Sequence, residues 1–62
     1  MAEFNGPTDW CKARDGTEIE LGWTEDETLV RVRFYNKHVS AMVIMTAADL
    51  DDLRKLLNDR LE

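Results

Sequence analysis

Apolar and polar residues alternate along two stretches of this chain. In residues 18–23, EIELGW, every second position is apolar. In residues 29–35, LVRVRFY, the apolar positions Val30, Val32 and Phe34 are separated by arginines. Alternation with a period of two is typical of strands that bury one face. The pattern therefore predicts one strand in each stretch.

A third strand is predicted at residues 38–45, HVSAMVIM, where nearly every position is apolar. Asn36-Lys37 before it is expected to form a tight turn, because asparagine tolerates the left-handed backbone region. A two-residue turn at this point would place Val32 opposite Ala41. The apolar rows of the two strands would then share one face, as burial of a single face requires.

The connection between the first two strands, residues 24–27 (TEDE), is polar. A four-residue loop there would place Leu21 opposite Val30 on the same apolar face. On the reverse face it would set Glu20 opposite Arg31, and opposite charges that face each other across strands are mildly stabilising. The register predicted from the loops thus agrees with both the apolar and the charged positions.

Two interpretations fit residues 10–14, WCKAR: a fourth strand, or a short helical turn capped by Thr8. Asp15-Gly16 follows them, and this dipeptide favours a type I′ turn, in which both central residues have positive φ. Residues 1–9 contain Asn-Gly-Pro and are expected to form an irregular N-terminal arm. The opening residues MAEF have no pattern of their own, which leaves open that they are a cloning remnant.

The spacing of apolar residues changes after the third strand. Leucines then recur at intervals of three and four, at Leu50, Leu53, Leu57 and Leu61. This period is typical of an amphipathic helix. Thr46 stands where a helix N-cap is expected, and Asp49 three residues later resembles the acidic member of a capping box. We predict a C-terminal helix of about 15 residues.

These elements predict an α+β fold with residues 10–62 as a single small domain. It is a three-stranded antiparallel β-meander, four-stranded if residues 10–14 form a strand, with one C-terminal amphipathic helix packed on one face. The helix is expected to cover the face that carries Val30, Val32 and Phe34. The reverse face has no second helix to cover it.

The reverse face is expected to carry a band of apolar residues flanked by two arginines. Its members are Leu29, Arg31, Arg33, Tyr35, Met42 and Ile44. A chain of 62 residues buries only about 60% of the surface that it exposes when unfolded, and oligomerisation is a common remedy for this marginal stability. We therefore predict that the band is an interface and that self-association, as a dimer, is its use.

The sequence gives little basis for catalysis. His38 stands alone at a predicted turn, and Cys11 is the single cysteine, so neither a metal cluster nor an intramolecular disulfide is expected. The three glycines are scattered and form no phosphate-binding loop. No apolar stretch is long enough to span a membrane. We expect a soluble, cytoplasmic protein that is not an enzyme and binds no cofactor.

The alternative is a DNA-binding domain that reads through the basic strand face. Arg31, Arg33 and Lys37 occur in RVRFYNK with aromatic residues between them. The net charge of −5 and the glutamates expected opposite the arginines weaken this alternative. The favoured function is a small acidic interaction module or regulator that binds another protein of unknown identity. By analogy, these properties would suit a phage-encoded accessory protein.

Overall fold

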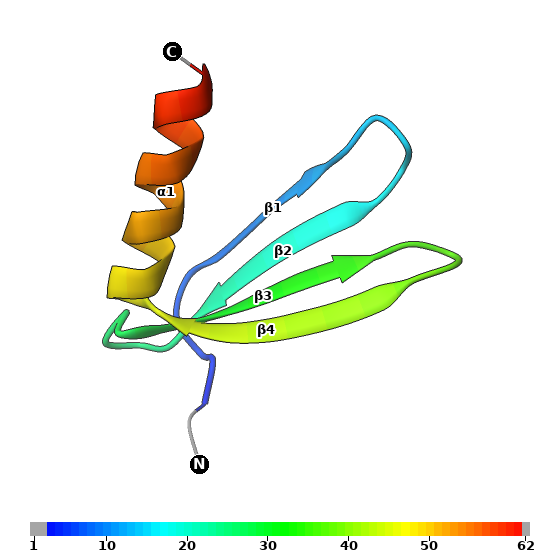
Figure 1. The fold of residues 1–62 in the computed structure, drawn as a ribbon. Coiled ribbons are helices and arrows are strands. Elements are labelled where there is room, and N and C mark those ends of the chain that lie inside the picture. The colour runs from blue at the N-terminus through cyan, green and yellow to red at the C-terminus, as the bar shows by residue number, and fades with distance from the viewer. Residues whose placement is uncertain (1–2, 62) are drawn as a thin grey trace.

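The computed structural model describes residues 3–61 and contains four strands followed by one helix (Figure 1). The elements are β1 (Thr8–Lys12), β2 (Glu18–Trp23), β3 (Leu29–Tyr35), β4 (Ser40–Thr46) and α1 (Ala47–Leu61). The strands pair in the order β1-β2-β3-β4, and every pair is antiparallel. The α+β meander is therefore confirmed in its four-stranded form, and residues 10–12 belong to a strand rather than to a helical turn.

The loop between β1 and β2 is a turn followed by one left-handed glycine. The Ala13 amide donates to the Thr17 carbonyl at 2.8 Å, and the Gly16 amide donates to the Ala13 carbonyl at 3.0 Å. Gly16 has φ of 92°, whereas Asp15 is not among the described residues with positive φ. The predicted type I′ turn is therefore wrong. A tight turn closed by a left-handed glycine is the usual three-residue hairpin loop.

The pairing of β2 with β3 differs from the predicted register by two residues. Val30 lies opposite Trp23, and Leu21 lies opposite Val32 instead of Val30. The cause is the loop, which is closed by a bond from the Thr24 amide to the Leu29 carbonyl at 3.1 Å and so begins one residue later than predicted. Moving both ends of a loop by one residue shifts the pairing by two. The faces of the strands are unchanged because side chains alternate with a period of two.

The same displacement occurs between β3 and β4. Val32 lies opposite Val43 rather than Ala41. The turn lies one residue later than the predicted Asn36-Lys37. The Asn36 amide donates to the Val39 carbonyl at 2.9 Å, so Asn36 precedes the turn instead of forming part of it. The Asn36 side-chain oxygen also accepts bonds from the backbone amides of residues 38 and 39, at 2.7 and 2.9 Å. Asparagine therefore serves as the residue that precedes the turn.

The N-terminal arm is partly ordered by backbone pairing with the end of β2. The Gly6 amide donates to the Trp23 carbonyl at 2.8 Å, and the Trp23 amide donates to the Pro7 carbonyl at 3.0 Å. A Cβ atom on Gly6 would collide with the Thr24 carbonyl, so this close approach requires glycine. The arm is thus shorter than the predicted residues 1–9. Whether MAEF is a cloning remnant falls partly on residues 1–2, which lie outside the described part of the chain.

Helix α1 begins directly where β4 ends, with no connecting residue. The Thr46 hydroxyl accepts a bond from the Asp49 amide at 3.1 Å, as predicted for an N-cap. The Ala47 amide donates to the Thr28 carbonyl at 3.0 Å and ties the start of the helix to the loop before β3. The junction between β4 and α1 is therefore held by one bond to the first turn of the helix and by one bond to the loop before β3.

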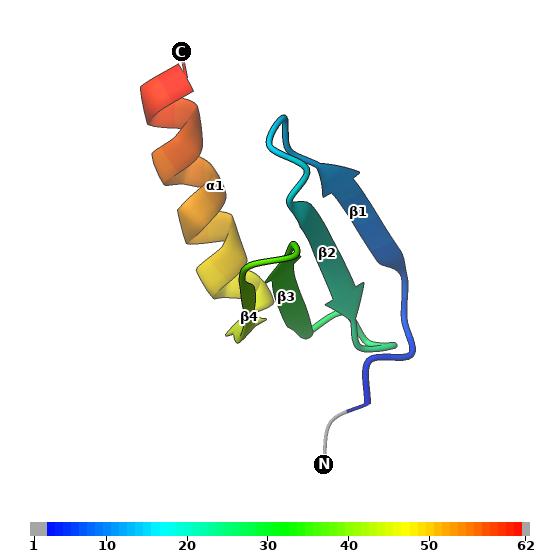
Figure 2. The same ribbon diagram turned by 90° about the vertical axis from the view of Figure 1, so that its right-hand side faces the viewer.

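The helix does not lie along the sheet. In Figure 1, α1 and the strands meet at the end where β4 passes into the helix, and from there they point in different directions; in Figure 2, seen from the side, α1 stands apart from β1 and β2. Val30 and Val32 are the buried apolar residues among those described. Along the predicted apolar stripe of the helix, the exposed fraction rises from 42% at Leu53 to 52% at Leu57 and 82% at Leu61. The expectation that α1 covers one face of the sheet is therefore wrong beyond the first helical turn.

Candidate interaction surfaces

The six residues predicted as an interface lie on one face of the sheet, which we call the back face. Arg31 pairs with Ile44, and Arg33 pairs with Met42. Leu29 and Tyr35 occupy positions of the same parity on β3. Because residues that pair across antiparallel strands point to the same side, the structure places all six together.

Exposure within this group is uneven. Met42 and Ile44 on the outer strand β4 are 58% and 54% exposed. The four members on β3 are half-buried, because strands lie on both sides of them. The exposed apolar part of the predicted band is thus confined to one edge of the back face.

The two arginines of the back face share one carboxylate. The Glu20 Oε1 atom lies 3.6 Å from an Arg33 nitrogen and 4.0 Å from an Arg31 nitrogen. Glu20 stands directly opposite Arg33, not Arg31 as predicted, and the Arg31 guanidinium also lies over the ring of Phe4 at 5.2 Å. Part of the positive charge on this face is therefore neutralised within the molecule.

Tyr35 lies beside the same charges. The Arg33 guanidinium lies 5.3 Å from the centre of the Tyr35 ring. Partial desolvation raises the pKa of Tyr35 above its usual value, and the negative charges of Glu18 and Glu20 raise it further, while Arg33 opposes them. Glu18 pairs with Tyr35 in the structure, whereas the predicted register would pair Glu18 with Arg33. Partial desolvation and the two carboxylates thus disfavour the ionised form of this phenol.

Trp10 was not predicted as part of any interface. It is 66% exposed and pairs with Glu20, so it lies at a back-face position of β1. A strand at residues 10–14 was one of two interpretations, and the side on which Trp10 lies could not be stated without choosing between them. Large aromatic residues with this exposure are typical contact residues in protein interfaces.

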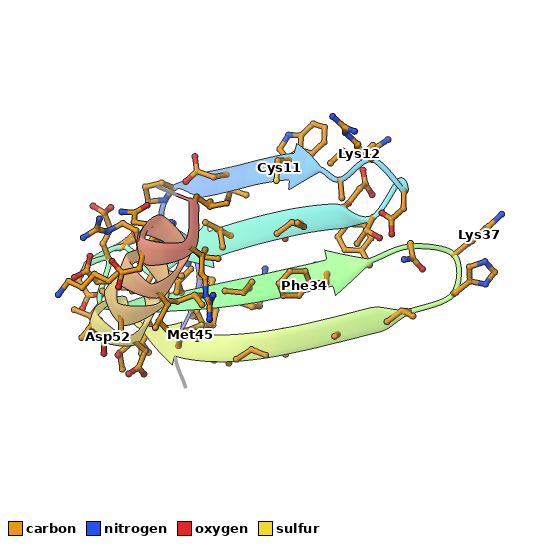
Figure 3. The ribbon with its side chains drawn as sticks, turned by 45° about the horizontal axis from the view of Figure 1, so that its top comes forward. Cys11, Lys12, Phe34, Lys37, Met45 and Asp52 are labelled. Atoms are coloured by element: carbon orange, nitrogen blue, oxygen red, sulfur yellow. The ribbon has the colours of Figure 1, made fainter. Side chains whose placement is uncertain are left out.

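The opposite side of the sheet is open as well. We define the front surface by Phe34 and Val43 on the sheet together with Leu53, Leu57 and Leu61 on α1, all of which are exposed. Figure 3 shows Phe34 on β3 well away from α1, toward the free end of the sheet. The sequence predicts Phe34 to lie under the helix, and this prediction is wrong. The signal that could have revealed the front surface is the absence of any linker between Thr46 and Ala47.

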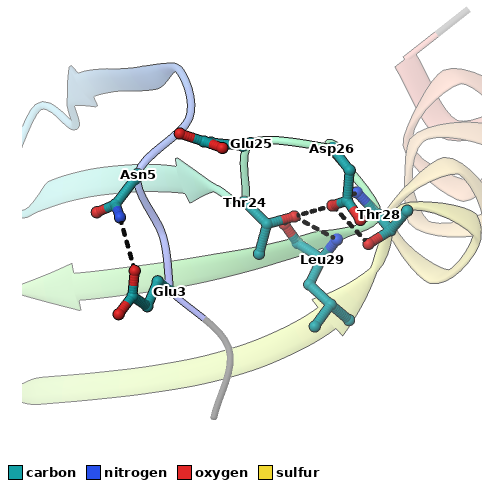
Figure 4. A pocket seen from close by; sticks show the side chains of 7 residues that line it. All are labelled: Glu3, Asn5, Thr24, Glu25, Asp26, Thr28 and Leu29. Carbon is teal, nitrogen blue, oxygen red and sulfur yellow. Dashed lines mark hydrogen bonds between the residues drawn. The ribbon is translucent and has the colours of Figure 1, made fainter.

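A polar hollow of about 410 Å³ lies where the arm passes the loop between β2 and β3 (Figure 4). Asp26 organises it: its Oδ1 accepts bonds from the hydroxyls of Thr24 and Thr28 at 2.7 and 2.8 Å and from the Thr28 amide at 3.2 Å. These bonds hold the pKa of Asp26 below its usual value. Asp26 makes each of these bonds within its own loop, so its carboxylate stabilises the conformation of that loop.

The remaining candidate chemical groups are separate from one another. Cys11 is exposed on β1, and His38 lies in the loop between β3 and β4. Among residues 3–61, no three His, Cys, Asp or Glu side chains are grouped so as to hold a metal ion. The helix of the described chain is not long and apolar enough to cross a membrane. No family model, curated protein or solved structure matches the chain.

Proposed function

We propose that this protein is a small, non-enzymatic protein-interaction module that self-associates through an exposed sheet surface. One observation carries the proposal: the chain exposes 5139 Å². A compact protein of 7.2 kDa is expected to expose about 4100 Å². The excess of about 1000 Å² exceeds the roughly 800 Å² that each partner buries in a standard interface.

The chemical nature of the exposed surface supports the same proposal. Large apolar side chains are exposed on both faces of the sheet and along the helix; they include Trp10, Met42, Val43, Leu56 and Leu57. Large exposed apolar patches on soluble proteins commonly mark surfaces that a partner covers. The single exposed thiol of Cys11 is compatible with a reducing, cytoplasmic setting, which belongs to the proposal.

Sedimentation equilibrium tests the proposal. We expect the weight-average mass to rise from that of one 7.2 kDa chain toward twice that value as concentration increases from about 1 μM to 1 mM. A mass that stays at one chain throughout would contradict self-association. Size-exclusion chromatography with light scattering on the same samples provides an independent mass.

DNA binding is the second candidate. The back face carries the cationic side chains of Lys12, Arg31 and Arg33 together with the exposed ring of Trp10. Cations that follow a strand face and an aromatic ring that can stack are the usual parts of a single-stranded nucleic-acid site. The carboxylates of Glu18 and Glu20 on the same face oppose it. Titration with a single-stranded oligonucleotide distinguishes the two functions, since binding that weakens steeply with added salt would favour DNA.

A further inference from the structure

We infer that the sheet part of the front surface is covered by helix α1 of a second copy of this chain, so that two chains form a twofold dimer by exchanging their C-terminal helices. The inference rests on the proposed self-association and names its geometry. The partner is the protein itself, and the contact is between a helix and a sheet. The back faces of both copies stay outside the contact.

The first argument is that α1 is held away from its own sheet. The helix follows β4 without a linker, and both the N-cap bond from Asp49 to Thr46 and the bond from Ala47 to Thr28 fix its start. The rising exposure of the leucines toward the C-terminus follows from this divergence. An amphipathic helix owes most of its stability to packing of its apolar face. That packing must therefore come from another chain.

The second argument is that the partly exposed front face of the sheet fits such a helix. Three rows of paired residues cross β2, β3 and β4 on this face, and none contains a charge: Ile19, Phe34 and Ala41; Leu21, Val32 and Val43; Trp23, Val30 and Met45. The seven-residue strands are about 23 Å long, and the fifteen-residue helix is about 22 Å long. A helix of this length is long enough to cover the part of the face that stays exposed, which includes Phe34 and Val43; Val30 and Val32 are already buried within the chain.

The third argument is symmetry. Each chain offers one exposed apolar helix face and one partly exposed apolar sheet face, so two copies can cover each other in a closed twofold arrangement. The area in excess of a compact chain, about 1000 Å², is large enough for the roughly 800 Å² that one partner contributes to a standard interface. The back face is a poorer candidate for this contact, because Glu20 already engages both arginines and Phe4 lies against Arg31.

Two neighbouring residues on β4 provide a matched test of which face is buried. Val43 on the front face and Met42 on the back face are similarly exposed in the single chain, at 50% and 58%. We expect Val43→Lys to weaken dimerisation at least tenfold in sedimentation, whereas Met42→Lys leaves it within about twofold. Circular dichroism establishes that each variant keeps its strands and helix. Loss of the dimer in Met42→Lys alone would overturn the inference and leave self-association intact.

A complementation experiment tests the exchange itself. Leu57→Glu should also weaken dimerisation at least tenfold, while Asn58→Glu adds the same charge beside it and has little effect. When Val43→Lys and Leu57→Glu chains are mixed, the heterodimer gathers both substitutions into one contact, where their charges are opposite, and its other helix-on-sheet contact has two native surfaces. We expect the mixture to form dimers at least tenfold more tightly than either variant alone.

The outcomes separate the inference from the proposed function. Restored dimers in the mixture support the exchange of helices. Variants that dimerise as weakly when mixed as when alone overturn it, because a contact that pairs helix with helix and sheet with sheet leaves no native contact in the mixture. Native protein that remains monomeric at every concentration overturns both the inference and the proposed function.

Discussion

At the scale of single residues, polar side chains of this protein mostly complete the hydrogen bonding of nearby backbone. Asp15 accepts a bond from the Thr17 amide at 2.9 Å, and Asp26 accepts bonds from two threonines. These bonds lower the pKa of both carboxyls. A group whose pKa is lower in the folded state contributes stability that is present above its unfolded value and is lost as the pH falls through the folded value. Both loops are therefore acid-sensitive.

The pKa of Tyr35 is raised rather than lowered, and this shift gives a direct prediction. It is the single tyrosine of the chain, so its ionisation can be followed by ultraviolet absorbance without overlap from another phenol. Its pKa is raised above 10.0, and its contribution to stability is therefore complete below that pH and is lost as the pH rises through the folded value. We expect Glu18→Gln to lower the pKa of Tyr35 and Glu3→Gln to leave it unchanged. Identical titrations of native protein and Glu18→Gln would count against this account.

At the scale of elements, the turns determine how the strands pair. Asn36 contributes most clearly, because its side-chain oxygen accepts two amides of its own loop and its nitrogen donates to the Thr17 hydroxyl at 2.9 Å. One side chain thus closes the hairpin of β3 and β4 and links it to the neighbouring hairpin. The Thr17 bond spans residues far apart in sequence and fixes the two loops relative to each other.

We predict that Asn36→Ala lowers the free energy of unfolding by about 1–2 kcal/mol, since it removes the acceptor for two amides and the bond to Thr17. Asn36→Asp keeps the acceptor and should lose less than half as much. Urea denaturation at one fixed protein concentration measures both. Thr17→Val is the matched control for the link between the hairpins and should resemble Asn36→Asp. Equal losses in Asn36→Ala and Asn36→Asp would assign the stability to that link instead.

The sequence predicted elements and faces correctly but misplaced the pairing. Alternation assigned Val32 and Arg33 to opposite faces correctly, because parity survives a shift of two residues. The shift itself came from loop ends that side chains determine, such as Asn36 bonding ahead of its turn rather than within it. The six back-face residues were predicted as a group for the same reason of parity.

The spacing of the leucines did not predict the front surface, because that surface depends on the direction in which α1 leaves β4. Leucine spacing reveals which side of a helix is apolar, but not which surface that side meets. The direction is fixed by contacts of the folded chain, including the bond from Ala47 to Thr28. A helix placed over Phe34 was the reasonable expectation from sequence, and the missing linker after Thr46 was the one available warning.

At the scale of the whole molecule, the chain is flatter than a compact domain of its length. Its extents are 32 × 31 × 16 Å and its radius of gyration is 12.6 Å, against about 10.6 Å expected for 62 compact residues. Each chain carries a net charge of −5, so two chains repel each other over the screening length of about 10 Å at 0.1 M salt. Added salt should therefore strengthen the dimer, whereas it would weaken binding to DNA.

The dependence of thermal stability on concentration follows from the same geometry. If folding and association are coupled, the melting temperature falls on dilution, because mass action favours the separated, unfolded chains. Tenfold dilution changes the free energy by about 1.4 kcal/mol, and the unfolding entropy of two 62-residue chains converts this to a shift of about 5 °C. We expect this shift in calorimetry for the native protein and for Met42→Lys. Val43→Lys should melt at a lower temperature that does not change with dilution, since its chains no longer pack against each other. A native melting temperature that stays constant over a hundredfold range of concentration would mean that each flat, open chain is stable alone.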